Sequence, residues 1–176
     1  MFRHLRSAVL AALLCALAPV AAPGAETIKL PFGLRWGETT TRLERLLTGA
    51  KATIKERRTV AGREVWEVEG ILARDLQRTM FYFSRGELVE VELQYRTAEW
   101  DEDKYNTFMG DVRKKLEQKY GPPELVARKE EPLGEVIQKV VGWKWNQNNT
   151  AIELFDFSAQ TGRHTFRTLS VHYKAY

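Results

Sequence analysis

The segment of residues 88–95 limits the fold more than any other part of the chain. Its apolar side chains are Val89, Val91, Leu93 and Tyr95, and the polar ones between them are Glu90, Glu92 and Gln94. Alternation with a period of two predicts a β-strand that packs one face and exposes the other to water. A sheet with one apolar face needs a second layer to cover it.

Two amphipathic helices are predicted to supply that layer. In residues 101–120 apolar residues recur every three or four positions, with acidic residues at the start and lysines near the end, as the helix dipole favours. A shorter helix is predicted before Gly49. Thr39, Thr40 and Thr41 are its candidate N-caps, and Thr41 with Glu44 has the spacing of a capping box. So short a helix is marginal alone, and packing must therefore hold it in place.

Turn residues divide the remainder into strand-like segments. These are residues 52–58, 64–69, 78–83, 88–95, 125–128, 136–145, 151–157 and 166–174. One helix and four strands thus occur twice, and Trp36 and Trp100 precede the two helices at equivalent places. The pattern predicts a single α+β domain over residues 26–176, in which two helices cover an antiparallel sheet. A tandem repeat of residues 31–96 and 97–176 would build it.

The first 25 residues have the features of an export signal. Arg3 and Arg6 precede a run of Ala, Val and Leu that closes on small residues near Ala25. A basic start, a short apolar run and a small-residue end are typical of a secretory signal peptide, and the run is short for a membrane span. We therefore expect a periplasmic or secreted protein cleaved near Ala25, with an uncleaved anchor as the alternative. Cys15 follows Leu14 rather than a small residue, which disfavours a lipoprotein.

Composition excludes several classes of function for the mature chain. Cleavage near Ala25 would remove the only cysteine, which excludes disulfide scaffolds, cysteine-ligated zinc, iron–sulfur clusters and thiol nucleophiles. Without Arg3 and Arg6, 25 basic residues face 23 acidic ones, interspersed along the chain. The expected export and the near balance of charges argue against nucleic-acid binding. The basic residues of the second helix could meet anionic lipid, although the helix dipole explains the later ones; they are Arg113, Lys114, Lys115 and Lys119.

Catalytic chemistry finds little support in the sequence. The mature chain has only two histidines, His164 in a turn and His172 on the outward face of the last strand, and no metal site or cofactor is predicted. Its serines, Ser84, Ser158 and Ser170, lie outside any Gly-x-Ser-x-Gly phrase. Glu90 and Glu92 face the same way and could act as an acid–base pair on a sugar, but a solvated strand face would leave their pKa values untuned.

The polar sheet face is the better candidate for a functional surface. If the strands of residues 64–95 form a meander, one face carries Glu67, Tyr82, Glu90 and Glu92. An acidic face with an aromatic residue could dock a protein or peptide, and an ordinary half-solvated sheet face is the plain alternative. The leading hypothesis is a non-enzymatic binding or accessory protein whose partner is another envelope protein or a peptide. The alternatives are a small cell-envelope hydrolase using surface carboxylates and a self-associating structural subunit.

Two short phrases carry a resemblance to known proteins. They are Phe-Gly-Leu-Arg-Trp-Gly at residues 32–37, before the first helix, and Lys-Tyr-Gly-Pro-Pro at residues 119–123, after the second. They resemble phrases in small exported bacterial proteins, and the layout is similar to the fold of the β-lactamase inhibitor protein and, more distantly, of the outer-membrane assembly lipoproteins. The resemblance implies a periplasmic or secreted binding protein rather than an enzyme. Both phrases are structural, and we predict that Trp36 anchors the first helix instead of binding a ligand.

Overall fold

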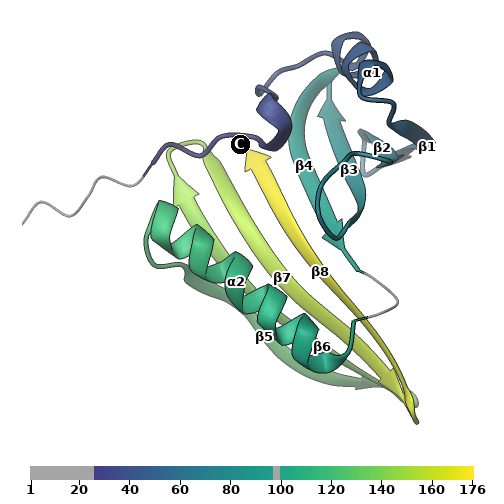
Figure 1. Ribbon diagram of the computed structural model, residues 1–176, viewed down its shortest axis with the longest axis vertical. Helices are drawn as coiled ribbons and strands as arrows, with labels where there is room; N and C mark the ends of the chain where they lie inside the picture. Colours follow the sequence, from purple (N-terminus) through teal and green to yellow (C-terminus); the bar gives the residue numbers. More distant parts are fainter. Residues whose placement is uncertain (1–25, 97–99) are drawn as a thin grey trace, which may run out of the picture.

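The structure is a computed structural model and describes residues 26–96 and 100–176 (Figure 1). The predicted signal peptide of residues 1–25, with Cys15, lies outside the described residues. The elements in chain order are the 3-10 helix η1 (Pro31–Gly33), α1 (Thr40–Gly49), β1 (Thr53–Val60), β2 (Arg63–Glu69), β3 (Leu76–Ser84), β4 (Glu87–Tyr95), α2 (Glu102–Tyr120), β5 (Glu124–Leu133), β6 (Val136–Gln147), β7 (Thr150–Thr161) and β8 (His164–Ala175). None of the described helices is long and apolar enough to cross a membrane.

All eight strands form one antiparallel sheet. Their order is β1-β2-β3-β4-β8-β7-β6-β5, so β4 and the last strand of the chain lie side by side at its centre. Each half of the sheet is a meander of strands consecutive in sequence, and the β4–β8 pairing joins the two halves. In that pairing Glu90 lies opposite Lys174 and Glu92 lies opposite His172. This single contact between strands therefore brings together residues about 80 positions apart.

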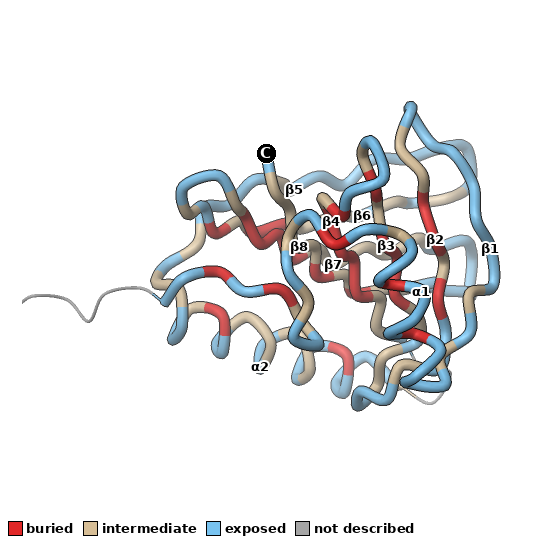
Figure 2. The backbone as a smooth tube through the Cα atoms, turned by 90° about the horizontal axis from the view of Figure 1, so that it is seen from above, coloured by how far each residue is buried: buried red, intermediate tan, exposed pale blue. Residues whose placement is uncertain are grey.

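Both helices lie on the same side of the sheet, and α2 runs along the half formed by β5–β8 (Figures 1 and 2). One apolar cluster fills the space between the layers. It includes Leu43 and Leu47 of α1, Tyr105 and Leu116 of α2, and inward residues of six strands from Trp66 to Val171. The α+β prediction, with two helices covering an antiparallel sheet, is confirmed at this level.

The helix ends have clear local causes. Thr39 caps α1, because its hydroxyl accepts a hydrogen bond from the Arg42 N–H at 3.3 Å. Thr39 is one of the three threonines that the sequence offered as caps, whereas the capping-box pair of Thr41 and Glu44 does not form, since Thr41 is already inside the helix. Glu44 instead binds Arg57 of β1 at 2.5 Å. The first of the three candidate threonines is thus the cap of α1.

The two tryptophans that precede the helices both anchor the chain. Trp36 is half-buried and packs against the core, and Gly37 next to it has a φ of 76°, which glycine adopts without strain. The Trp100 ring lies 5.2 Å from the ring of Tyr105 and 4.6 Å from that of Phe108, both in α2. These contacts agree with the structural role predicted for Trp36.

Replacing Trp36 by alanine is expected to lower the free energy of unfolding by about 2 kcal/mol, because a half-buried indole leaves a void beside the core. Urea denaturation of both proteins would measure the difference. Phe32→Ala is the matched control, since this neighbouring aromatic side chain is 44% exposed, and it should cost less than about 1 kcal/mol. Equal midpoints for the Trp36 variant and the wild type would contradict the anchoring role.

The second half of the sheet differs from the prediction in the length of its strands. Residues 125–128 were expected to form a short strand, but β5 extends over ten residues to Leu133. Its continuation through Lys129, Glu130 and Glu131 is exposed on both faces, so no alternation indicated it. An edge strand also tolerates Pro132, because the missing N–H need not join a ladder.

Strand β4 contains an irregularity that the simple alternation concealed. Tyr82 pairs with Glu90 while Phe83 pairs with Leu88, which leaves Val89 as an extra residue in the β3–β4 ladder. Such a bulge shifts the side-chain alternation by one position. Leu88 is consequently buried in the core, whereas Val89, which was predicted to face inward, is only half-buried.

Candidate functional site

The four residues predicted to form a binding surface share one face of the sheet, opposite the helices. Glu67 lies on β2, Tyr82 on β3, and Glu90 and Glu92 on β4. Glu92 accepts a hydrogen bond from the Tyr82 hydroxyl at 2.5 Å. Glu67 joins the same group through Arg78, which bonds it at 2.9 Å. Among the described residues no helix or strand covers this face (Figure 2).

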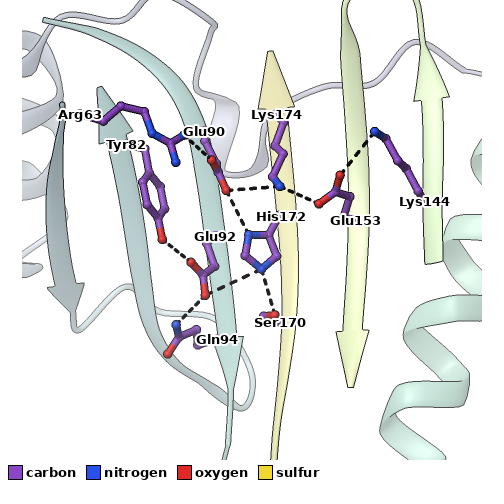
Figure 3. Close-up of polar contacts among 10 residues, drawn as sticks. All are labelled: Arg63, Tyr82, Glu90, Glu92, Gln94, Lys144, Glu153, Ser170, His172 and Lys174. Carbon is purple, nitrogen blue, oxygen red and sulfur yellow. Dashed lines mark hydrogen bonds and ion pairs between the residues drawn. The ribbon is translucent and has the colours of Figure 1, made fainter. Parts of the chain in front are cut away.

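The expectation that Glu90 and Glu92 are solvated is wrong. Glu90 is only 6% exposed and Glu92 only 8%. The face lacks a covering layer, yet long side chains from neighbouring strands lie over these carboxylates and bond to them (Figure 3). Because a buried carboxylate is costly unless it is paired, the partners define the site as much as the glutamates do.

Glu90 is the most highly connected member of this cluster. Its carboxylate binds Arg63 Nη1 at 2.8 Å and His172 Nδ1 at 3.1 Å, and Lys174 Nζ lies 3.9 Å away. Lys174 in turn donates to Glu153 of β7 at 2.6 Å, and Lys144 of β6 lies 3.5 Å from the same carboxylate. A continuous line of opposite charges thus crosses the sheet from β2 to β6 (Figure 3).

A second set of hydrogen bonds surrounds Glu92. Besides Tyr82, it accepts a bond at 2.6 Å from Gln94 Nε2, and Gln94 Oε1 accepts one at 2.6 Å from Arg78. His172 Nε2 lies 3.8 Å from Oε1 of Glu92, the oxygen that also accepts from Gln94. Burial and the bond to Glu92 raise the pKa of Tyr82, so its phenol stays protonated and remains a donor. The ten residues labelled in Figure 3 are called the charged face below. They are Arg63, Tyr82, Glu90, Glu92, Gln94, Lys144, Glu153, Ser170, His172 and Lys174.

The electrostatics of Glu90 bear directly on the hydrolase alternative. Burial raises the pKa of this carboxyl, but the hydrogen bond from His172, the charge of Lys174 and the bond from Arg63 outweigh burial, so the net pKa is lowered. A general acid at neutral pH needs a raised pKa. Glu90 is therefore an ionised acceptor, which does not favour its use as a proton donor.

The lowered pKa of Glu90 predicts a specific acid sensitivity. A carboxyl whose pKa is lower in the folded state stabilises the fold above its unfolded value, near 4.5, and this stabilisation is lost as pH falls through the folded pKa. Glu90→Gln should therefore be less stable than the wild type at neutral pH, and the gap should narrow as the solution is acidified below about pH 4.5. Urea denaturation at a series of pH values would measure both proteins. A constant gap would refute the prediction.

Seven of the ten residues of the charged face were not predicted as site residues, and two of them, Arg63 and Gln94, lie on β2 and β4. Lys144, Glu153, Ser170, His172 and Lys174 come from β6, β7 and β8. The alternation along β8 had already placed His172 on an outward face, but it could not indicate which strand lies beside it. Only the pairing of β4 with β8 brings the two groups together.

An aromatic patch adjoins the charged face on the same side of the sheet. It consists of Phe155 and Phe157 on β7 and Phe166 on β8, whose ring lies 6.3 Å from that of Phe157. The Phe155 ring meets the His172 ring edge-on at 5.5 Å. Gly142 of β6 lies directly beside Phe155, and a Cβ there would be 2.5 Å from its ring, so the glycine creates the space for it.

The clefts of the molecule lie elsewhere. One of about 820 Å³ lies between α2 and the segment before β3, and its lining includes Arg74, Tyr95 and Phe108. Another, of about 670 Å³, lies between α2 and the far ends of β6–β8, beside Arg167. The predicted binding residues line neither of them. Within residues 26–96 and 100–176 no three His, Cys, Asp or Glu residues gather as a metal ion would require.

Comparison of the chain with protein-family models, with curated proteins and with solved structures gave no significant match. The fold and the site therefore define the protein by class. It is an α+β protein with one eight-stranded antiparallel sheet, two helices on one face and a network of paired charges on the other.

Proposed function

We propose that this chain is an exported binding or accessory protein that recognises another envelope protein through its charged face and the adjoining aromatic patch. The observation that supports this most is an uncovered sheet face whose side chains are nevertheless buried and mutually bonded. A stable fold does not require five strands to contribute paired charges to an open surface, because buried ion pairs add little net stability. Recognition of a partner protein would account for such an arrangement.

The geometry suits the docking of a protein. Side chains already fixed by their neighbours lose little conformational entropy on binding, which leaves more of the contact energy for affinity. Aromatic residues and arginine are enriched where proteins meet, and the surface offers Tyr82, Phe166 and Arg63. Arg63 is well placed for this, since it lies 5.0 Å from the Tyr82 ring and is 40% exposed. Alternating charge would fix the orientation of the partner.

The two alternatives have less support. A hydrolase using Glu90 and Glu92 as an acid–base pair is disfavoured by the lowered pKa of Glu90. Self-association could occur through the same surface, and light scattering on the purified protein would reveal a stable oligomer. The expected periplasmic or secreted location follows from residues 1–25 and remains part of the proposal.

The origin of the fold is also proposed. The element order, one helix and four strands in each half, supports a tandem duplication. The same order, with two helices on one face of an eight-stranded sheet, supports the resemblance to the β-lactamase inhibitor protein, which is itself a binding protein. No functional residue is transferred from it.

Crosslinking and pull-down of the tagged protein from its native envelope fraction would test the function. The wild type is expected to recover a specific protein that Arg63→Ala and Phe166→Ala recover poorly. Leu133→Ala is the matched control, because this side chain is also exposed but lies at the β5–β6 turn, and it should recover the partner normally. Recovery of no specific protein, or equal recovery by all four proteins, would refute the proposal.

A further inference from the structure

Three residues of the charged face are connected in a way that recognition alone does not require. Ser170 Oγ lies 3.0 Å from Nε2 of His172, and the other ring nitrogen, Nδ1, lies 3.1 Å from Oε1 of Glu90 (Figure 3). Ser170 and His172 lie on β8 and Glu90 on the adjacent β4. This is the order of contacts in a serine–histidine–carboxylate nucleophile system, which is identified by geometry rather than by position in the sequence.

The carboxylate determines the direction of the hydrogen bonds. Ionised Glu90 can only accept, so Nδ1 of a neutral His172 must carry the proton that it donates to Glu90. Nε2 then has a free lone pair and accepts from the Ser170 hydroxyl. A neutral imidazole in this tautomer can remove a proton from the serine.

The imidazole is also held in position. Arg63 and Lys174 hold the Glu90 carboxylate, and the edge-on contact with the Phe155 ring limits rotation of the His172 ring. His172 is only 15% exposed, whereas Ser170 is half-buried and borders the open face. The base is therefore fixed while the hydroxyl remains within reach of a ligand.

The neighbours of Ser170 offer two further requirements of acyl transfer, a hydrogen-bond donor for the oxyanion and an apolar surface for the acyl group. Gln94 lies opposite Ser170 on β4, and within the described part of the chain its Nε2 donates to Glu92 alone, which leaves a second N–H for a substrate oxyanion. Amide side chains serve as such donors in known enzymes. On the β7 side Phe155 lies opposite Ser170, and Phe157 and Phe166 continue the apolar surface.

We propose that Ser170 is an activated nucleophile that attacks carboxylic esters with an apolar acyl group. Ser170 Oγ bonds to the ester carbonyl carbon as its proton passes to His172 Nε2, and the oxyanion accepts the bond from Gln94. Collapse of this tetrahedral intermediate breaks the bond between the carbonyl carbon and the alcohol oxygen of the ester. The alcohol leaves with the proton from His172. Water then attacks the acyl-serine with His172 as the base, which releases the acid and restores Ser170. Glu90 is a positioning residue, because it acts through His172.

This reaction can be tested separately from the proposed recognition of a protein, because labelling of Ser170 needs no partner protein, although Arg63 and Phe166 contribute to both sites. A fluorophosphonate probe tests it on the purified protein. Attack by Ser170 would form an oxygen–phosphorus bond with loss of fluoride, and peptide mass spectrometry would locate the adduct. We expect labelling at Ser170 that is absent in Ser170→Ala and at least about 100-fold slower in His172→Gln, which lacks the base.

Ser158→Ala is the matched control, because Ser158 lies on β7 with its side chain on the helix side of the sheet, and its labelling should equal that of the wild type. Circular dichroism would establish that each variant is folded. Glu90→Gln should lower kcat for a p-nitrophenyl ester with little change in KM, and added imidazole should partly restore the activity of His172→Ala. An unlabelled Ser170 in the folded wild type would overturn the proposal, and so would labelling that is equally fast without His172.

Discussion

Replacing Lys174 by methionine is expected to lower the free energy of unfolding by about 3 kcal/mol, although the substitution keeps the length and apolar stem of the side chain. Lys174 bonds Glu153 at 2.6 Å and lies 3.9 Å from Glu90, and the side chains of these glutamates are only 11% and 8% exposed. Removal of the amine leaves both carboxylates with fewer partners in a poorly solvated place. Urea denaturation at neutral pH would measure the loss.

A surface pair provides the matched control for this variant. Lys55 and Glu69 lie 3.6 Å apart with side chains about half exposed, so Lys55→Met should cost less than about 1 kcal/mol. Adding Glu153→Gln to the Lys174 variant should recover part of the lost stability, since it removes one of the two carboxylates that lost a partner. Equal stability of the Lys174 and Lys55 variants would show that the charged face is solvated in solution.

Gly142→Val is expected to cost a similar amount, about 3 kcal/mol, for a steric reason. Even a single Cβ at this position would be 2.5 Å from the Phe155 ring and 3.2 Å from the Ala127 methyl group. The ring would have to leave its place beside His172, and the valine methyl groups would add to the crowding. Thermal or urea denaturation would detect the loss.

A double variant that combines Gly142→Val with Phe155→Ala separates steric crowding at the ring from the backbone effects of replacing a glycine in a strand. In a Phe155→Ala background the space beside residue 142 is empty, so Gly142→Val should then cost less than about 1 kcal/mol. Valine also favours a strand more than glycine does, which can offset part of the remaining cost. The same large loss in both backgrounds would locate the strain in the backbone instead of at the Phe155 ring.

Local patterns were sufficient to predict the class of fold. Alternation along β4 and β8 and the three- and four-residue spacing in α2 are properties of short segments, and they predicted a sheet with helices on one side. The prediction was wrong where a segment has no apolar face, as in the charged part of β5, and where a bulge at Val89 shifts the alternation. The sequence could not single out Thr39 as the cap of α1, because three consecutive threonines offer equivalent side chains.

Only the part of the site that lies on β3 and β4 could be predicted from the sequence. Tyr82, Glu90 and Glu92 lie on strands that are consecutive in the chain, so a hairpin argument brings them together. His172 reaches Glu90 because strands far apart in sequence pair, and no local pattern encodes that choice. Burial of the glutamates follows from the same distant partners, which is why alternation alone predicted a solvated face.

The pairing of β4 with β8 has a consequence for folding during synthesis. Of the described strands β8 is synthesised last, so β4 is an open edge of the β1–β4 meander until β8 pairs with it. During that interval Glu90 and Glu92 lack His172 and Lys174, and their charges keep the edge hydrated and discourage pairing with other chains. Pairing across so long a separation is slow to form. The glutamates that later belong to the buried network thus first protect the incomplete sheet against pairing with other chains.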